Sequence, residues 1–226
     1  SPPDYLYLDM PYEFAPREPG YYGATRFTDE QKIFTCSPDN LAMNAETATD
    51  RDGKAFSATG QGSWPGAAGM SAQLWSEIVR TDEQMEYRLY PRLLAVAERA
   101  WHQADWELPG QQGQAFEKGK TRQVNQQQLQ ADWNRFATLL GRSVLPGLDT
   151  AGIRYRIPVA GARIRNGVLE ANTSLPGIRI EYSVDEGQHW RNYQPQQPPA
   201  VAGKVLVRTR SPDGRRSGRV VSLQAG

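Results

Sequence analysis

Two short segments of the sequence place an aromatic side chain and a carboxylate two residues apart. Tyr7 and Asp9 end an apolar run near the start of the chain. Trp75 and Glu77 end a second run, which begins at Gly69. Residues two apart in a strand point to the same side, so each pair is expected to project together from the carboxyl end of a strand. Because α/β enzymes build their sites at such ends, the two segments predict a site.

An aromatic ring beside a carboxylate is suited to carbohydrate binding. The 226 residues of the chain include six Trp and ten Tyr. Sugars offer apolar C–H faces to aromatic rings and hydroxyls to acidic side chains, so Trp75 with Glu77 would stack a sugar ring and fix its hydroxyls together. On periodicity alone, a core aromatic residue at a strand end explains Trp75 equally well.

Other catalytic chemistry has little support in the sequence. His102 and His189 lie at no ligand spacing from a thiol or from each other, which favours structural or exposed roles and no metal site. Ser76 and the single cysteine, Cys36, lack a nearby base and the glycines of a nucleophile elbow. The Gly-Gln-Gly at 60–62 lacks the lysine of a phosphate loop and indicates a turn. No cofactor is predicted.

The uneven distribution of charge indicates two domains. Residues 1–150 carry 14 Lys and Arg against 20 Asp and Glu, a balance of −6, whereas the rest carries 12 against 5, a balance of +7. The basic residues of the second part are scattered singly, which favours a solvated surface over nucleic acid as a partner. The sequence has no apolar run of the roughly 18 residues that a membrane span needs.

The hydropathy pattern of residues 1–145 predicts an α/β part. Residues 5–10 and 69–75 are each predicted as a buried parallel strand. The stretch 11–65 between them, rich in Pro, Gly and Asp, is expected to be a functional loop with at most a short helix at 28–31. Thr81 and Gln84 form a capping box before a helix that Pro91 divides. The predicted apolar stripe of that helix consists of Met85, Leu89, Leu93, Val96, Ala97 and Ala100.

A further helix is predicted after Asn125, ending at Gly141, and Pro146-Gly147 marks a boundary. Residues 146–226 then show short β segments separated by turns. We expect strands at 153–158, 162–165, 168–172, 178–183, 189–193, 204–210 and 218–223. Tight turns are predicted at Asn166-Gly167, Glu186-Gly187 and Asp213-Gly214. This pattern is typical of a small immunoglobulin-like β-sandwich.

Four motifs stand in an order and spacing that resemble a known family. They are Tyr-Leu-Asp-Met-Pro-Tyr-Glu at 7–13, Trp-Pro-Gly at 64–66, Ser-Ala-Gln-Leu-Trp-Ser-Glu at 71–77, and the helix from 91–92 to Ala-Glu-Arg-Ala-Trp at 97–101. The chain resembles bacterial chitobiases, the β-N-acetylhexosaminidases of glycoside hydrolase family 20. The resemblance implies the C-terminal portion of a (β/α)8 barrel, with 5–10 as strand seven, 69–75 as strand eight and 82–102 as the closing helix.

The resemblance also implies site roles. Family 20 enzymes retain the anomeric configuration without an enzyme nucleophile, because the 2-acetamido oxygen of the substrate attacks the anomeric carbon. Tyr7 matches the catalytic tyrosine that donates a hydrogen bond to this oxygen. Asp9 and Glu77 match carboxylates near the outer hydroxyls of the sugar, and Trp75 matches an aromatic wall of the acetamido pocket. These three are the candidate substrate-binding residues.

Two parts of the family's site depart from the pattern. The proton work belongs to an adjacent Asp-Glu pair at a strand end, but here such pairs occur only at 29–30, 82–83 and 185–186, in a predicted loop, helix start and hairpin turn. In addition, Tyr21-Tyr22 is followed by Gly23, where the resemblance implies an aromatic residue that stacks on the next sugar. Either Tyr22 substitutes for it as a substrate-binding residue, or the enzyme depends less on a second GlcNAc.

The resemblance therefore implies part of a retaining exo-β-N-acetylhexosaminidase that releases terminal GlcNAc or GalNAc and acts in chitin degradation. The expected partners are an N-acetylhexosamine-containing oligosaccharide such as chitobiose, and the missing N-terminal portion of the same barrel. The family implies a periplasmic or secreted location. We expect the isolated 226-residue chain to be inactive. The alternatives are a non-catalytic carbohydrate-binding module and a structural C-terminal module.

Overall fold

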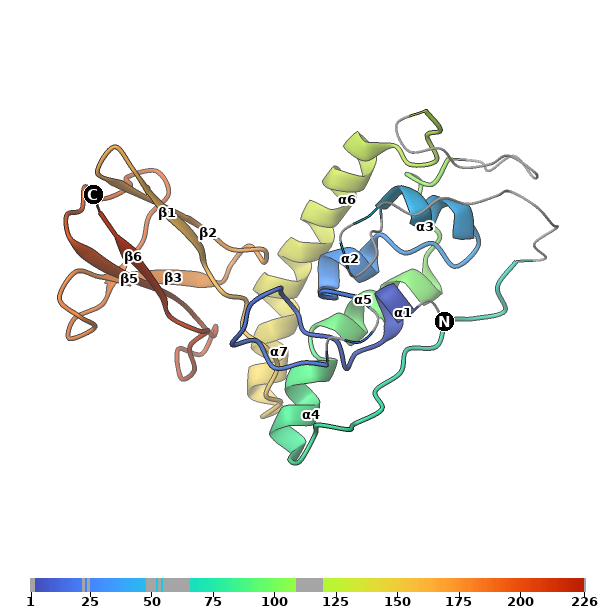
Figure 1. The fold of residues 1–226 in the computed structure, drawn as a ribbon, viewed down its shortest axis with the longest axis horizontal. Helices are drawn as coiled ribbons and strands as arrows, with labels where there is room; N and C mark the ends of the chain where they lie inside the picture. Colours follow the sequence, from blue (N-terminus) through green and yellow to red (C-terminus); the bar gives the residue numbers. More distant parts are fainter. Residues whose placement is uncertain are drawn as a thin grey trace. The chain divides into compact units, whose positions relative to one another are not determined.

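The computed structural model describes residues 3–21, 23, 25–47, 52, 54, 66–108 and 120–225. The chain divides into two compact units, 1–133 and 134–226. The first unit is helical and the second is mainly β (Figure 1). The predicted domain limit between 145 and 146 stays a prediction. The helices of the first unit are α1 (Pro3–Leu6), α2 (Glu30–Phe34), α3 (Leu41–Thr47), α4 (Asp82–Leu89), α5 (Arg92–Trp101) and the start of α6 (Gln126–Leu139).

The predicted strand at 5–10 forms at only one residue. Residues 3–6 are the short helix α1, and Tyr7 makes a single parallel bridge with Gln73. The Leu8 N–H donates to the Gln73 carbonyl at 2.7 Å, and the Gln73 N–H donates to the Leu6 carbonyl at 2.8 Å. The prediction of burial is confirmed for Tyr5, Leu6, Leu8 and Met10. A strand extends only where a neighbour continues the ladder, and here that neighbour pairs at one position.

The predicted buried strand at 69–75 is extended, but it is not buried. Only Gln73 is paired, and the segment ends at Trp75, whose side chain is 59 % exposed. Gly69 and Ser71 are also exposed. Within the described residues this segment has the bridge to Tyr7 on one side, so its other edge and much of its surface remain open.

The capping box and the division of the next helix are confirmed. The Gln84 N–H donates to the Thr81 hydroxyl at 3.2 Å, and the Gln84 side-chain oxygen accepts from the Arg80 N–H at 2.7 Å. Helix α4 ends before Tyr90, and α5 begins after Pro91. The side-chain amide thus reaches one residue further back than in a standard capping box.

The predicted apolar stripe of α4 and α5 is wrong for three of its six members. Val96 is buried, whereas Met85, Ala97 and Ala100 are exposed. The buried residues of these two helices are Arg88, Arg92, Ala95, Val96 and Arg99. Helix α5 packs beside α2 (Figure 1), and its arginines enter the interior because they meet backbone carbonyls there. The stripe rule counts only apolar side chains and therefore missed them.

An aromatic cluster forms the other part of the first core. The ring of Phe34 lies between two indoles, with centroid distances of 6.3 Å to Trp106 and 5.6 Å to Trp133. The indole N–H of Trp106 donates to Asp132 at 3.1 Å. Such edge-on and tilted pairs stabilise a core beyond their buried area. The cluster joins α2 to the first turns of α6.

Gly141 does not end the helix that starts after Asn125. Helix α6 continues as the π-helical turn η1 (Leu140–Val144) and then as α7 (Leu145–Thr150), which takes up Pro146 in its first turn. A Cβ on Gly141 would lie 2.1 Å from the carbonyl oxygen of Pro176. The glycine therefore permits a close backbone approach and is not a helix terminator.

The second unit contains two antiparallel sheets. Strands β1 (Gly161–Arg165) and β2 (Val168–Asn172) form a two-stranded sheet. The other sheet has the order β4-β3-β5-β6, with β3 (Arg179–Ser183), β4 (Arg191–Asn192), β5 (Lys204–Arg210) and β6 (Val221–Gln224). Both contribute to one core, in which Leu169 of β2 meets Ile180, Val205 and Val207. Two sheets that enclose a common core form a sandwich.

Six of the seven predicted strands form. Residues 153–158, all of them described by the structure, do not form the seventh. Its backbone acceptors bind side chains instead of a neighbouring strand. Arg216 donates to the Tyr155 carbonyl at 3.0 Å, and the Thr209 hydroxyl donates to the Pro158 carbonyl at 2.5 Å. The predicted turn at Asn166-Gly167 is confirmed by φ values of 50° and 73°, which suit a two-residue hairpin turn.

Candidate functional site

The bridge between Tyr7 and Gln73 brings the two predicted segments together. The rings of Tyr7 and Trp75 meet edge to face, with a centroid distance of 6.1 Å and an interplanar angle of 72°. Tyr7 is half-buried and Trp75 is mostly exposed. The pairing of these segments in parallel is what the sequence predicts. Together the two rings form an open aromatic corner with one hydroxyl.

Asp9 does not project beside Tyr7. Its side chain is 1 % exposed, and its two carboxylate oxygens accept backbone N–H groups from Trp75 at 2.8 Å and Ser76 at 3.0 Å. The Asp9 carbonyl accepts from the Tyr21 N–H at 2.8 Å and from the Arg88 guanidinium at 3.0 Å. The expected alternation failed because Tyr7 is an isolated bridge residue: the helix α1 precedes it and the chain turns after it. A contact of Asp9 with substrate stays a prediction.

Glu77 lies in a turn, not in a strand. Ser76 before it has a φ of 66°, in the left-handed region that few residues other than glycine adopt. The two-residue alternation that pairs Trp75 with Glu77 therefore does not apply. The carboxylate of Glu77 is exposed, and its carbonyl accepts from Arg80 at 2.9 Å. Glu77 stays close to Trp75 in sequence, but Ser76 sets its direction.

Tyr22 lies outside the described residues, so its predicted role stays a prediction. Its neighbour Tyr21 is 54 % exposed. A Cβ on Gly23 would lie 2.4 Å from Cε1 of the Tyr21 ring. The ring of Tyr21 thus occupies the space that a side chain at position 23 would take.

Buried arginines of α4 and α5 hold the backbone beneath the aromatic corner. The guanidinium of Arg92 is fully buried and donates to the carbonyls of Met10 at 2.7 Å and Thr28 at 2.9 Å, as well as to Leu8 and Arg88. The guanidinium carbon Cζ of Arg92 lies 4.0 Å from the ring centroid of Tyr12. Burial lowers the pKa of Arg92, and Tyr12 opposes that shift. The apolar pattern of the sequence did not indicate these residues, which lie at the end of α4 and the start of α5.

The three adjacent Asp-Glu pairs do not form a site. Asp29 is the N-cap of α2 and accepts the Lys32 N–H at 2.7 Å, which corrects its predicted place in a loop. Asp82 and Glu83 lie in the first turn of α4, as predicted. Asp185, also as predicted, lies in a turn, where it contacts the His189 ring at 2.7 Å. The backbone N–H of His189, the Ser183 hydroxyl and this ring keep the pKa of Asp185 low.

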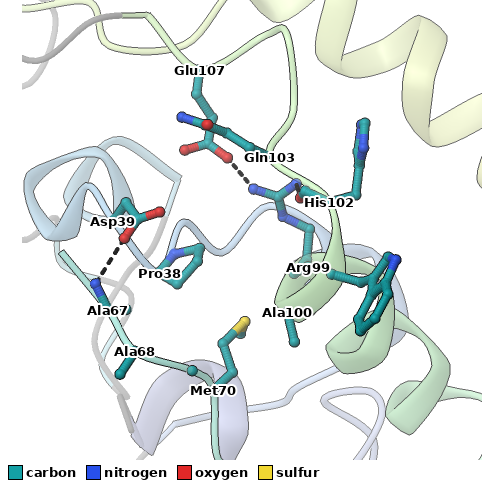
Figure 2. A pocket seen from close by; sticks show the side chains of 12 residues that line it. Pro38, Asp39, Ala67, Ala68, Met70, Arg99, Ala100, His102, Gln103 and Glu107 are labelled. Carbon is teal, nitrogen blue, oxygen red and sulfur yellow. Dashed lines mark hydrogen bonds and ion pairs between the residues drawn. The ribbon is translucent and has the colours of Figure 1, made fainter.

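A cavity of about 210 Å³ lies beside the C-terminal end of α5 (Figure 2). Its charged groups are already paired. Arg99 forms a buried ion pair with Glu107, and Asp39 accepts the Ala67 N–H at 2.8 Å. The predicted site residues are not among those that line this cavity. His102 does line it, but its side chain is exposed and finds no cluster of ligands there.

The described residues contain no group of three or more His, Cys, Asp or Glu side chains placed to hold a metal ion. Among the described helices, none combines the length and the apolar character that crossing a bilayer requires.

Cys36 is not a nucleophile in this fold, and its reactivity is a testable consequence. Burial raises the pKa of its thiol to about 12, against the effect of nearby Arg99. Since the thiolate is the reactive form, only about one thiol in 10⁴ would be ionised at pH 8. We expect the folded chain to resist Ellman's reagent and the urea-unfolded chain to release one equivalent. The Cys36→Ser variant is the blank, and rapid labelling of the folded chain would contradict this.

Comparison with known proteins gives the family. The sequence model of the glycosyl hydrolase family 20 catalytic domain matches residues 1–104, and that of the chitobiase/beta-hexosaminidase C-terminal domain matches residues 144–220. The chain belongs to glycosyl hydrolase family 20. It is 46 % identical to the N,N'-diacetylchitobiase of Vibrio harveyi over 224 residues, which are 99 % of this chain and 25 % of that relative.

Two further relatives of this family 20 chain also carry the name beta-hexosaminidase. It is 44 % identical to a beta-hexosaminidase of Vibrio vulnificus over 232 residues, covering 100 % of this chain and 27 % of the relative. It is also 44 % identical to beta-hexosaminidase B of Pseudoalteromonas piscicida over 149 residues, which are 63 % of this chain and 19 % of that relative. The chain thus spans about a quarter of the length of the two Vibrio relatives.

Proposed function

We propose that this chain is part of a retaining exo-β-N-acetylhexosaminidase and supplies the substrate-holding wall of its site. The observation that carries the proposal is the aromatic corner, in which the Tyr7 ring meets the Trp75 indole beside the parallel bridge between Tyr7 and Gln73. In the proposed mechanism the Tyr7 hydroxyl donates a hydrogen bond to the acetamido oxygen of the substrate. This contact holds the oxygen for attack on the anomeric carbon and stabilises the charge that develops. Trp75 stacks on the acetamido group, and Glu77 binds an outer hydroxyl.

We further propose that the Asp-Glu pair that performs the proton transfers belongs to a part of the protein outside these 226 residues. The three such pairs in this chain serve as an N-cap, a helix start and a turn. The open edge of the segment 69–75 and the greater length of the relatives favour an additional portion that completes the (β/α)8 barrel. In this proposal, residues around Tyr7 and Gln73 belong to barrel strands seven and eight, and α4 with α5 closes the barrel.

For the second unit we propose an immunoglobulin-like sandwich as the finer description. Its two antiparallel sheets and common core support that topology. The periplasmic or secreted location stays a prediction of the family resemblance.

The chain alone is expected to be inactive. Without a general acid, the leaving oxygen would depart unprotonated, and Tyr7 cannot replace that proton transfer. We expect no release of 4-nitrophenol from its N-acetyl-β-glucosaminide above the blank, and clear release by the protein that includes the upstream portion. The Tyr7→Phe variant, purified in the same way, detects a contaminating host enzyme, because a contaminant gives equal activity in both samples. Turnover by the chain itself that Tyr7→Phe abolishes would refute the divided site.

A further inference from the structure

An open groove of about 410 Å³ lies on the β1–β2 hairpin of the second unit. Its volume is within the range of about 300 to 1,000 Å³ that small-molecule sites occupy. Tyr193 and three successive cross-strand pairs line it, at the end of the hairpin opposite its turn: Gly161 with Asn172, Ala162 with Ala171, and Arg163 with Glu170. The groove shares no residue with the aromatic corner, so the two surfaces can be tested separately.

The absence of a side chain at Gly161 shapes one end of this groove. A Cβ on Gly161 would lie 2.3 Å from Oδ1 of Asn172, the residue opposite it in the sheet. Any other residue at 161 would therefore push the Asn172 amide out of its place over the strand. The glycine thus permits a close approach that keeps this exposed amide at the groove.

The polar groups of the groove retain hydrogen-bonding capacity for a ligand. The Tyr193 hydroxyl accepts the Ala171 N–H at 3.1 Å, which leaves its own proton to donate. Nε of Arg163 donates to one carboxylate oxygen of Glu170 at 2.6 Å, and the guanidinium has further N–H donors. The side chain of Asn172 makes no hydrogen bond within the part of the chain that the structure describes.

The groove carries no net charge, because its one cation is paired with its one anion. The side chains of Arg163 and Glu170 are 69 % and 41 % exposed, and an ion pair as exposed as this contributes little to stability. Each charged group does orient the other. A neutral surface that offers both donors and acceptors suits a neutral, hydroxyl-rich ligand, whereas a polyanion requires an excess of positive charge.

We propose that this groove is an ancillary carbohydrate-binding site that takes one N-acetylhexosamine residue of a longer glycan. The Asn172 amide donates to the acetamido carbonyl, and Glu170 with the Tyr193 hydroxyl binds ring hydroxyls. Because the groove is open, the neighbouring sugars of the chain remain in solvent. The choice of sugar rests on the proposed function. In this role the second unit binds the glycan polymer, while the first unit contributes to the cleavage of its ends.

Depletion of the full-length protein from a suspension of colloidal chitin tests the groove. Asn172→Ala should weaken binding about fivefold, the usual effect of losing one hydrogen bond, and Arg163→Ala with Glu170→Ala should weaken it further. Asn192→Ala and Lys204→Ala are the matched controls. They remove an exposed amide and the cation of an exposed ion pair from the other sheet of the same unit, and both should bind as wild type does.

Each variant should keep the wild-type melting temperature and the wild-type kcat/KM for 4-nitrophenyl N-acetyl-β-glucosaminide, which show that it is folded. Weaker chitin binding by the groove variants alone supports the proposal. The proposal is overturned if the groove variants bind like wild type, if the controls lose as much binding, or if wild-type protein does not bind chitin. It is also overturned if wild-type protein binds cellulose equally well, because cellulose lacks the acetamido group.

The same measurements separate this proposal from the proposed function. A protein that binds chitin through the groove but releases no 4-nitrophenol has the ancillary site and is not a hexosaminidase. A protein that releases 4-nitrophenol, and whose groove variants bind chitin normally, is a hexosaminidase without this site.

Discussion

Tyr7→Phe in the full-length protein is expected to reduce kcat about a hundredfold or more, the usual effect of losing one positioned donor to a developing charge. The substitution removes one oxygen and leaves the ring, so the contact with the Trp75 indole at 6.1 Å should persist. Because the proposed hydrogen bond strengthens as the acetamido oxygen attacks, the loss should fall mainly on kcat, with a smaller change in KM. Steady-state kinetics with an aryl N-acetylglucosaminide measure both.

Tyr5→Phe is the matched control for this prediction. Tyr5 lies two residues earlier in the same buried segment, and its hydroxyl donates to the Asn44 carbonyl at 2.9 Å. Losing that hydroxyl is expected to cost about 1 kcal/mol of stability and to leave kcat near the wild-type value. If Tyr7→Phe retained a third or more of wild-type kcat, Tyr7 would not be the residue that assists attack.

Arg92→Met is expected to destabilise the first unit by about 3 to 5 kcal/mol, since buried carbonyls would lose their donor and each unsatisfied group costs about 1 to 3 kcal/mol. Methionine fills a similar length but cannot donate to Met10 and Thr28. Arg92→Lys should also destabilise, because one ammonium cannot reproduce a planar fork of donors. Urea unfolding followed by tryptophan fluorescence measures the change, since four of the six tryptophans, Trp75, Trp101, Trp106 and Trp133, lie in the described part of the first unit.

Arg17→Met serves as the control for the arginine prediction. Arg17 is exposed in the same unit, so its replacement should change the free energy of unfolding by less than about 0.5 kcal/mol. An Arg92→Met chain as stable as the Arg17→Met chain would show that other groups satisfy the carbonyls around Arg92.

The sequence was sufficient for features that depend on local chemistry. The capping box at Thr81 and the hairpin turn at Asn166-Gly167 are both present. Each depends on a few neighbouring residues, whose preferences act whatever the rest of the chain does. The burial of Tyr5, Leu6, Leu8 and Met10 followed from their apolar character. The proximity of Tyr7 and Trp75 also followed, because the two apolar runs were assigned to neighbouring parallel strands.

Features that depend on long-range contacts could not be predicted. Arg92 would be placed at the surface by any rule of burial, since only the fold shows the carbonyls that it meets 64 to 84 residues away in sequence. The left-handed φ of Ser76 has no local signal, because serine does not favour it and the stabilising carboxylate of Asp9 lies 67 residues away. The turn after Tyr7 and the left-handed φ of Ser76 removed the alternation on which the predicted directions of Asp9 and Glu77 relied.

The close approach between Tyr21 and Gly23 has a consequence for how this loop can evolve. A side chain at position 23 would meet the Tyr21 ring, so a substitution there displaces that exposed ring before it gains any contact of its own. Because that ring belongs to an exposed side chain, it can rotate away, so the size of residue 23 sets the direction of the Tyr21 ring. The aromatic residue that the family pattern has after the same Tyr-Tyr pair would therefore require another orientation of Tyr21. Mutagenesis that seeks to alter the preferred glycan should randomise both positions in one library.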